Sequence, residues 1–222
     1  MGISERKERE KEQRRNMIID AAERIFFKKG IENSTMDDVA SEAELSKGTL
    51  YLYFKSKEDI QLAIAMRGSE ILKEMMQKRL SKNKTGYENL LELADISIDF
   101  SNKKKHYYEF FLFFQSTNFE QLNLEESRLI KYLTEQSPLA IVQECVSKGI
   151  MDKSLRPDIR ADVFAATLWS QLLGVMIVIN HKRNIYKMFG LKPEDIIKTH
   201  LELVSNGGRR FQISKSMVKQ RG

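Results

Sequence analysis

Side chains that hydrogen-bond well to phosphate gather in a short stretch, residues 45–57. The stretch contains three lysines and no acidic residue. Hydroxyl groups of Ser, Thr and Tyr and ammonium groups of Lys are frequent partners of nucleic-acid phosphates, and a glycine lets a backbone come close to a ligand. The sequence therefore predicts a phosphate-binding surface here, close to a nucleic acid. The candidate DNA-contacting residues are Thr35, which precedes the stretch, and within it Ser46, Lys47, Gly48, Thr49, Tyr51, Tyr53 and Lys57.

Two short helices joined by a tight turn are expected to position these side chains. Thr35 is a good N-cap, with Asp37 and Asp38 in the first turn, where the helix dipole favours negative charge. Ser46 is a second N-cap, for a helix that runs to about Tyr53. Two helices in this order form a helix-turn-helix, whose second helix can lie in the major groove of DNA. From spacing alone, an ordinary helical hairpin with a solvated polar face remains an equal alternative.

The residues themselves favour the first interpretation. The segments TMDDVA at 35–40 and AELSKGTLYLYFKSKE at 43–58 resemble the DNA-binding signature of the TetR family of bacterial regulators. The resemblance implies a homodimer formed by the last two long helices. It also implies a transcriptional regulator, usually a repressor, that a small molecule bound in the C-terminal domain releases from DNA. Glu44 departs from the pattern, because many relatives carry Gly there; at a positive φ it would cost roughly 1 kcal/mol.

The remaining sequence predicts an all-α protein of about nine helices in two domains. Residues 1–56 would form a three-helix DNA-binding domain, and residues 57–222 a helical ligand-binding and dimerisation domain. A helix from about residue 57 to 81 is shared by both, which makes it a mechanical link. Residues 4–15 mix both charges without an apolar residue. They form either a solvated helix start or a basic arm near DNA that uses Arg6, Arg9, Arg14 or Arg15.

An unusually aromatic segment, HYYEFFLFFQS at 106–116, is the candidate wall of an effector pocket. Ligand pockets are mostly apolar and aromatic with a few polar groups, although such a helix can equally pack into the core on two sides. The chain has a single tryptophan, which could face the same cavity. A small hydrophobic or aromatic effector is expected. The candidate residues are Tyr107, Phe110, Phe111, Phe114, Gln115, Trp169, Gln171 and Met176.

Residues 163–179 are apolar on almost every side, so a membrane span must be considered. The run is no longer than the roughly 20 residues that a span needs, and Thr167, Ser170 and Gln171 interrupt it. A deeply buried helix, covered by its own core and by a second copy of the chain, is the expected alternative. The candidate dimer residues are Leu168, Leu172, Val175, Ile197 and Leu201.

No pattern of residues indicates an enzyme, a cofactor or a metal site. The sequence lacks the phosphate-loop, zinc-protease and nucleophile-elbow motifs, and its three histidines lie far apart. Cys145 is the single cysteine, and the first residues contain no signal-peptide core, which together favour a cytoplasmic protein. The net charge of +6 arises mostly after residue 181 and does not itself indicate DNA binding. The rival function is a structural DNA-binding factor of the same fold that has no inducer.

Overall fold

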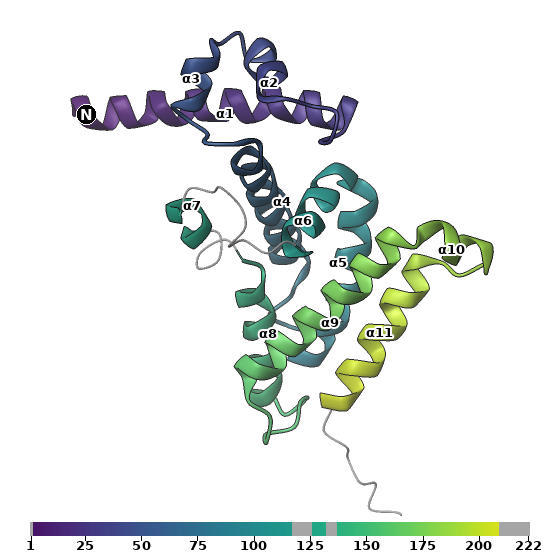
Figure 1. Cartoon of the computed structure of the whole chain (residues 1–222). Helices are drawn as coiled ribbons and strands as arrows, with labels where there is room; N and C mark the ends of the chain where they lie inside the picture. Colours follow the sequence, from purple (N-terminus) through teal and green to yellow (C-terminus); the bar gives the residue numbers. More distant parts are fainter. Residues whose placement is uncertain (1, 117–125, 132–136, 209–222) are drawn as a thin grey trace, which may run out of the picture. The chain divides into compact units, whose positions relative to one another are not determined.

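The computed structural model describes residues 2–116, 126–131 and 137–208, which form eleven helices and no strand. The all-α prediction is confirmed. The first half contains α1 (Ile3–Lys29), α2 (Met36–Glu42), α3 (Lys47–Tyr51), α4 (Lys57–Arg79), α5 (Gly86–Lys103) and α6 (Lys105–Ser116). The second half contains α7 (Glu126–Lys131), α8 (Leu139–Met151), α9 (Ala161–His181), α10 (Arg183–Met188) and α11 (Pro193–Gly208) (Figure 1).

The chain divides into two units by its internal packing. Unit 1 comprises residues 1–71 and 104–137, and unit 2 comprises residues 72–103 and 138–222. This division falls inside α4, later than the predicted boundary at residue 57. It divides the chain by packing, so the predicted boundary between a DNA-binding and a ligand-binding domain stays a prediction. The reason is that the first half of α4 contributes Ile60, Ala63 and Ile64 to the core of unit 1.

A single apolar core holds unit 1 together. In α1, residues Ile18, Ile19, Ala22 and Phe26 recur at helical spacing and are at most 3% exposed. They pack with side chains of the next three helices and of α6, namely Met36, Val39, Ala40, Leu50, Phe54, Ile60, Ala63, Ile64 and Phe110. The helix-turn-helix therefore lies on a rigid base, and α6 is part of that base.

Unit 2 is built on a close crossing of α5 with α8. Gly86 begins α5, and a Cβ atom on it would lie 2.1 Å from the backbone nitrogen of Gly149 in α8. This separation leaves no room for a side chain on Gly86, whereas a Cβ atom on Gly149 would meet the side chain of Leu155 at 2.6 Å. α5 and α9 then pack against α11.

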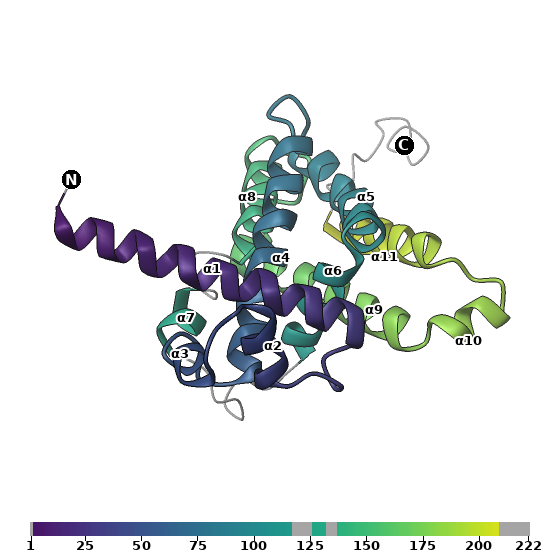
Figure 2. The same cartoon turned by 90° about the horizontal axis from the view of Figure 1, so that it is seen from above.

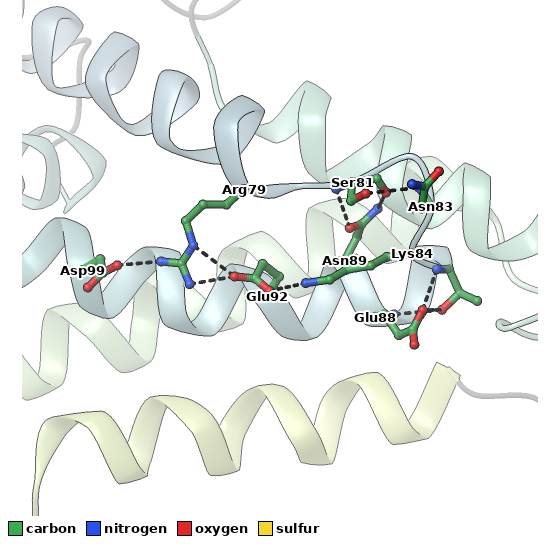
Figure 3. A network of polar contacts seen from close by, with 9 residues as sticks. Arg79, Ser81, Asn83, Lys84, Glu88, Asn89, Glu92 and Asp99 are labelled. Carbon is green, nitrogen blue, oxygen red and sulfur yellow. Dashed lines mark hydrogen bonds and ion pairs between the residues drawn. The ribbon is translucent and has the colours of Figure 1, made fainter.

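The end of α4 is fixed to α5 by an ionic network (Figure 3). The Arg79 guanidinium donates to Glu92 at 2.6 and 3.0 Å and to Asp99 at 2.6 Å. Lys84 donates to the second oxygen of Glu92 at 2.6 Å and, with Arg79, lowers the pKa of that carboxyl. A partly buried arginine that bonds two carboxylates is held more rigidly than an exposed ion pair, so this network fixes the end of α4 to α5.

Candidate nucleic-acid interface and effector cavity

A capping box begins α2, as the sequence predicts. Thr35 Oγ1 accepts the backbone N–H of Asp38 at 3.1 Å, and the Asp38 carboxylate accepts the N–H of Thr35 at 2.9 Å. Lys29 donates to Asp38 at 2.9 Å. These bonds, led by that from Lys29 and followed by those from Thr35, lower the pKa of Asp38 to about 2. The start of α2 is therefore held both by its own cap and by the end of α1.

The turn between α2 and α3 uses a left-handed residue. Glu44 has a φ of 55°, and the following N–H, that of Leu45, returns to the carbonyl of Ala40 at 2.9 Å. The positive φ confirms the strain considered for a non-glycine residue at this position. Leu45 packs on the core of unit 1 and closes the gap between the helices.

Helix α3 exposes polar side chains while one leucine holds it to the core. Ser46 Oγ accepts the N–H of Thr49 at 3.1 Å, and Leu50 is fully buried. Lys47 lies 2.8 Å from Asp37, whose hydrogen bond raises the pKa of the lysine. Both side chains of this pair are about 60% exposed. Because exposed pairs contribute little to stability, Lys47 can exchange Asp37 for a phosphate at small cost.

The structure places the predicted DNA-contacting residues in two groups. Thr35, Ser46, Lys47, Gly48 and Tyr51 are exposed, whereas Thr49, Tyr53 and Lys57 are partly buried.

Lys57 has partners within unit 1. Its ammonium group donates to the carbonyl oxygens of Ile31 at 3.1 Å and Ser34 at 3.2 Å, and so closes the loop between α1 and α2.

The candidate residues chosen from the sequence did not include Leu52, which follows α3 and exposes 80% of its surface beside the candidate interface. The signal for it was available, because the residue lies between two tyrosines of the motif.

The aromatic helix α6 packs against α1 within unit 1. The rings of Phe26 and Phe110 lie 6.1 Å apart between centroids, and those of Phe27 and His106 stack at 4.4 Å. The Tyr107 hydroxyl donates to Glu23 in α1 at 3.0 Å. Burial, with the charge of Glu23, raises the pKa of Tyr107 to about 12. The predicted pocket wall thus belongs to the base of the helix-turn-helix.

The remaining members of the predicted aromatic set differ in exposure. Phe111 and Phe114 are fully buried, and Gln115 is partly buried.

A small apolar cavity lies in unit 2 instead. Its volume of about 10 Å³ is close to the least that can hold one water molecule. Of the predicted pocket residues only Trp169 lines it; Met176 is buried elsewhere and Gln171 is exposed. The lining residues come from five helices and are Met76, Leu90, Leu93, Val142, Leu168, Trp169, Leu172 and Leu201.

Four of the five predicted dimer residues point into unit 2. Leu168, Leu172, Ile197 and Leu201 are at most 5% exposed in the single chain, and only Val175 is partly exposed. Of the five, Val175 is the one that is open to a second copy without rearrangement of unit 2. The outward side of α9 carries mostly small side chains, which are Val163, Ala166, Thr167, Ser170, Gln171, Gly174 and Val178.

Helix α9 is long and apolar enough to cross a membrane by length and composition, and is the one such helix among the described residues. Burial covers 33% of the most apolar part of it. Core helices of soluble proteins have the same length and composition, so this is weak evidence for a span.

No group of three or more His, Cys, Asp or Glu side chains in the described residues could hold a metal ion. Cys145 is 5% exposed, and burial, followed by the charge of Glu144, raises the pKa of its thiol to about 11. A thiol with so little thiolate is a packing group rather than a reactive one.

Three known proteins are similar to this chain in sequence or in fold. The transcriptional regulator YhgD of Bacillus subtilis is 27% identical over 147 residues, which cover 65% of this chain and 73% of YhgD. The transcriptional repressor DhaR of Mycobacterium sp. GP1 is 22% identical over 77% of this chain and 84% of its own. Thermus thermophilus FadR, a TetR-family repressor solved with lauroyl-CoA, has a TM-score of 0.68 at 21% identity, covering 90% and 98% of the two chains.

The helix-turn-helix has a family match of its own. Residues 18–64, from the core of α1 into the first turns of α4, match the model of the bacterial regulatory proteins of the tetR family. This segment contains the two capped helices and the turn described above. Residues 18–64 therefore form a helix-turn-helix DNA-binding domain of the tetR family, and the chain resembles transcriptional regulators over 65–77% of its length.

Proposed function

We propose that the chain is a repressor that binds a palindromic operator as a homodimer and leaves it when a hydrophobic effector binds unit 2. The observation that carries the DNA-binding part is the polar face of α3, presented on a capped helix that Leu50 anchors in the core. A helix of five residues reaches few base pairs. Two copies, about 34–36 Å apart on successive turns of DNA, would supply the contacts that tight specific binding needs.

The outward side of α9 is the proposed contact between the two copies. It combines small side chains with Val163 and Val178, which are 51% and 48% exposed. Small residues allow two helices to approach closely, and an apolar helix that its own unit covers only in part gains stability from a second cover.

Replacement of Gly174 tests this contact. A Cβ atom on Gly174 would meet no other atom within 4 Å, so Gly174→Arg leaves the protomer intact but places a charge in the interface. Sedimentation should show monomers that unfold at no lower urea concentration than the wild-type protomer. The matched change Gly174→Ala should preserve the dimer. An intact Gly174→Arg dimer would place the interface elsewhere.

The effector is proposed to enter between the helices that line the cavity of unit 2. All eight lining residues are apolar or aromatic, which selects a hydrophobic ligand. A volume of about 10 Å³ admits no such ligand until the helices separate. The related repressor FadR binds lauroyl-CoA, so a long-chain acyl-CoA is the first class to test.

Helix α4 would carry the signal of binding. Met76 of α4 lines the cavity, and Arg79 fixes the same helix to α5 (Figure 3). A ligand that displaces Met76 moves a helix whose first half lies in the core under the helix-turn-helix. It need only bind the displaced state more tightly to shift the population away from the DNA-binding one.

Emission from Trp169 tests the effector proposal directly, since it is the single tryptophan and lines the cavity. Lauroyl-CoA should change the emission saturably and should release operator DNA over the same concentration range. By reciprocity, operator DNA should weaken effector binding by the same factor. Val142→Leu, which fills the cavity by one methylene, should weaken the effector and leave DNA binding unchanged. If acyl-CoA and other apolar compounds neither bind nor release DNA, the inducer model fails.

One observation favours the rival function, a structural DNA-binding factor without an inducer. Phe111 and Phe114 are fully buried, and the cavity is almost filled, as a protein without a ligand would require. The fluorescence titration decides between the two, because a structural factor has no ligand that couples to DNA.

A further inference from the structure

The first turns of α1 extend beyond the body of unit 1. α1 has 27 residues, whereas its buried apolar residues begin only at Ile18. Residues 4–14 are exposed throughout. Figures 1 and 2 both show this part of the helix running on past α2 and α3. An extension that is only solvated needs no particular order in its charges. An ordered charge pattern would therefore indicate a binding surface.

The two sides of α1 face different neighbours. On one side, Arg67 of α4 donates to Asp20 at 2.6 Å and to the side-chain oxygen of Asn16 at 3.2 Å. On the other side, Lys29 bonds Asp38 of α2 at 2.9 Å. In Figure 1, α2 and α3 are drawn above α1, and the first turns of α4 below it. Any residue of the extension can therefore be assigned to the α4 side or to the helix-turn-helix side by its helical spacing.

Three cations continue the side that faces the helix-turn-helix. Lys7, Lys11 and Arg14 precede the fully buried Ile18 by eleven, seven and four residues, so all four share one face. Within the described chain none of the three makes an ion pair. By comparison, Arg6 pairs with Glu10 at 2.8 Å.

Three of the four carboxylates of the extension lie on the other side, and the fourth, Glu10, lies beside the row and pairs with Arg6. Glu5, Glu8 and Glu12 follow one another at spacings of three and four, and Glu12 lines the groove between α1 and α4. Apart from Arg9, which shares the face of Asn16, the charges toward α4 are thus acidic, and apart from Glu10 those of the row toward α2 and α3 are basic. A helix that needed only solvation would gain from pairing its charges across i and i+4, and this one leaves a row of three cations unpaired.

We propose that Lys7, Lys11 and Arg14 form a second DNA-binding surface, which contacts backbone phosphates beside the bases that α3 reads. The inference rests on the proposed DNA-binding function and adds a contact outside the helix-turn-helix. The row is basic, unpaired and on the same side of α1 as the recognition helix, which are the properties that phosphate contacts require. Residues 4–14 span roughly 16 Å at 1.5 Å per residue, equivalent to about five base pairs.

The test compares two triple variants that remove the same number of cations. The first is Lys7→Gln, Lys11→Gln and Arg14→Gln, in which glutamine preserves the helix. The control is Lys82→Gln, Lys153→Gln and Lys192→Gln, three exposed lysines of unit 2. Affinity for operator DNA is measured against salt concentration on a duplex with ten extra base pairs at each end, and on one trimmed to the bases that α3 requires.

On the long duplex, the first variant should lower the slope of log affinity against log salt by about 2.7 per protomer, since each phosphate contact contributes about 0.9. The control should leave the slope unchanged, and trimming should reduce the wild-type slope toward that of the first variant. Equal slopes for wild type and the first variant, or equal losses in both variants, would overturn the inference. Wild-type protein that binds no DNA at all would instead refute the proposed function.

Discussion

Replacing Lys57 by alanine should destabilise the fold rather than weaken phosphate binding. The Lys57 ammonium group closes the loop between α1 and α2 with bonds of 3.1 and 3.2 Å to the carbonyls of Ile31 and Ser34. A hydrogen bond from a charged group contributes about 1.5–3 kcal/mol. At a half-buried site, water can form some of the hydrogen bonds that are lost. The contributions of two bonds from one donor to the free energy also do not add fully. We therefore expect Lys57→Ala to lower the free energy of unfolding by about 2–3 kcal/mol.

Urea unfolding and DNA titration together separate the two roles of Lys57. If Lys57 ties the loop to α4, its loss lowers the urea midpoint and weakens DNA binding through the altered loop, and the salt slope stays unchanged. If Lys57 instead contacts a phosphate, its loss lowers the salt slope by about one unit and hardly affects the urea midpoint. Lys55→Ala is the matched control, because Lys55 is exposed and lies two residues away. An unchanged midpoint with a reduced slope would refute the reasoning from the structure.

Three further predictions concern packing, backbone strain and pH. Gly86→Ala should lower the free energy of unfolding by about 1–3 kcal/mol or more in urea, because its Cβ would lie 2.1 Å from the Gly149 nitrogen; full stability would contradict the close crossing. Glu44→Gly should raise stability by roughly 1 kcal/mol by relieving a φ of 55°, and a loss would show that the Glu44 side chain has a role of its own. Glu92 has a lowered pKa, first through Lys84, so its contribution is complete above its unfolded pKa and is lost as the pH falls through the folded value. In Glu92→Gln the free energy of unfolding should accordingly fall less steeply as the pH is lowered. An equally steep fall in the variant and the wild type would refute this.

Local features could be predicted from the sequence because neighbouring residues determine them. The caps at Thr35 and Ser46 and the turn at Glu44 each depend on contacts within five residues. The all-α class followed from helical periodicity in the same way. These features are also the ones that define the DNA-binding candidate site.

Features that depend on distant partners could not be predicted. Lys57 bonds a carbonyl 26 residues earlier, and a lysine at a helix start looks the same in sequence whether it binds phosphate or backbone. The aromatic α6 gave no indication of which unit it would join, since its aromatic residues are spread around the helix. The same reason explains why Leu168 and Leu172 were expected at a dimer surface although they line the cavity. A helix apolar all round does not reveal which side faces its own core.

Selection of binding sites from random duplex DNA tests the central claim, that this chain is a dimeric regulator which reads an operator with α3. The account predicts an inverted repeat whose half-sites lie about one helical turn apart, 10–10.5 base pairs from centre to centre. Selection repeated with Lys47→Ala should enrich a different or weaker half-site, because Lys47 lies exposed on α3. Enrichment of an unpaired site, or of no sequence at all, would contradict the claim.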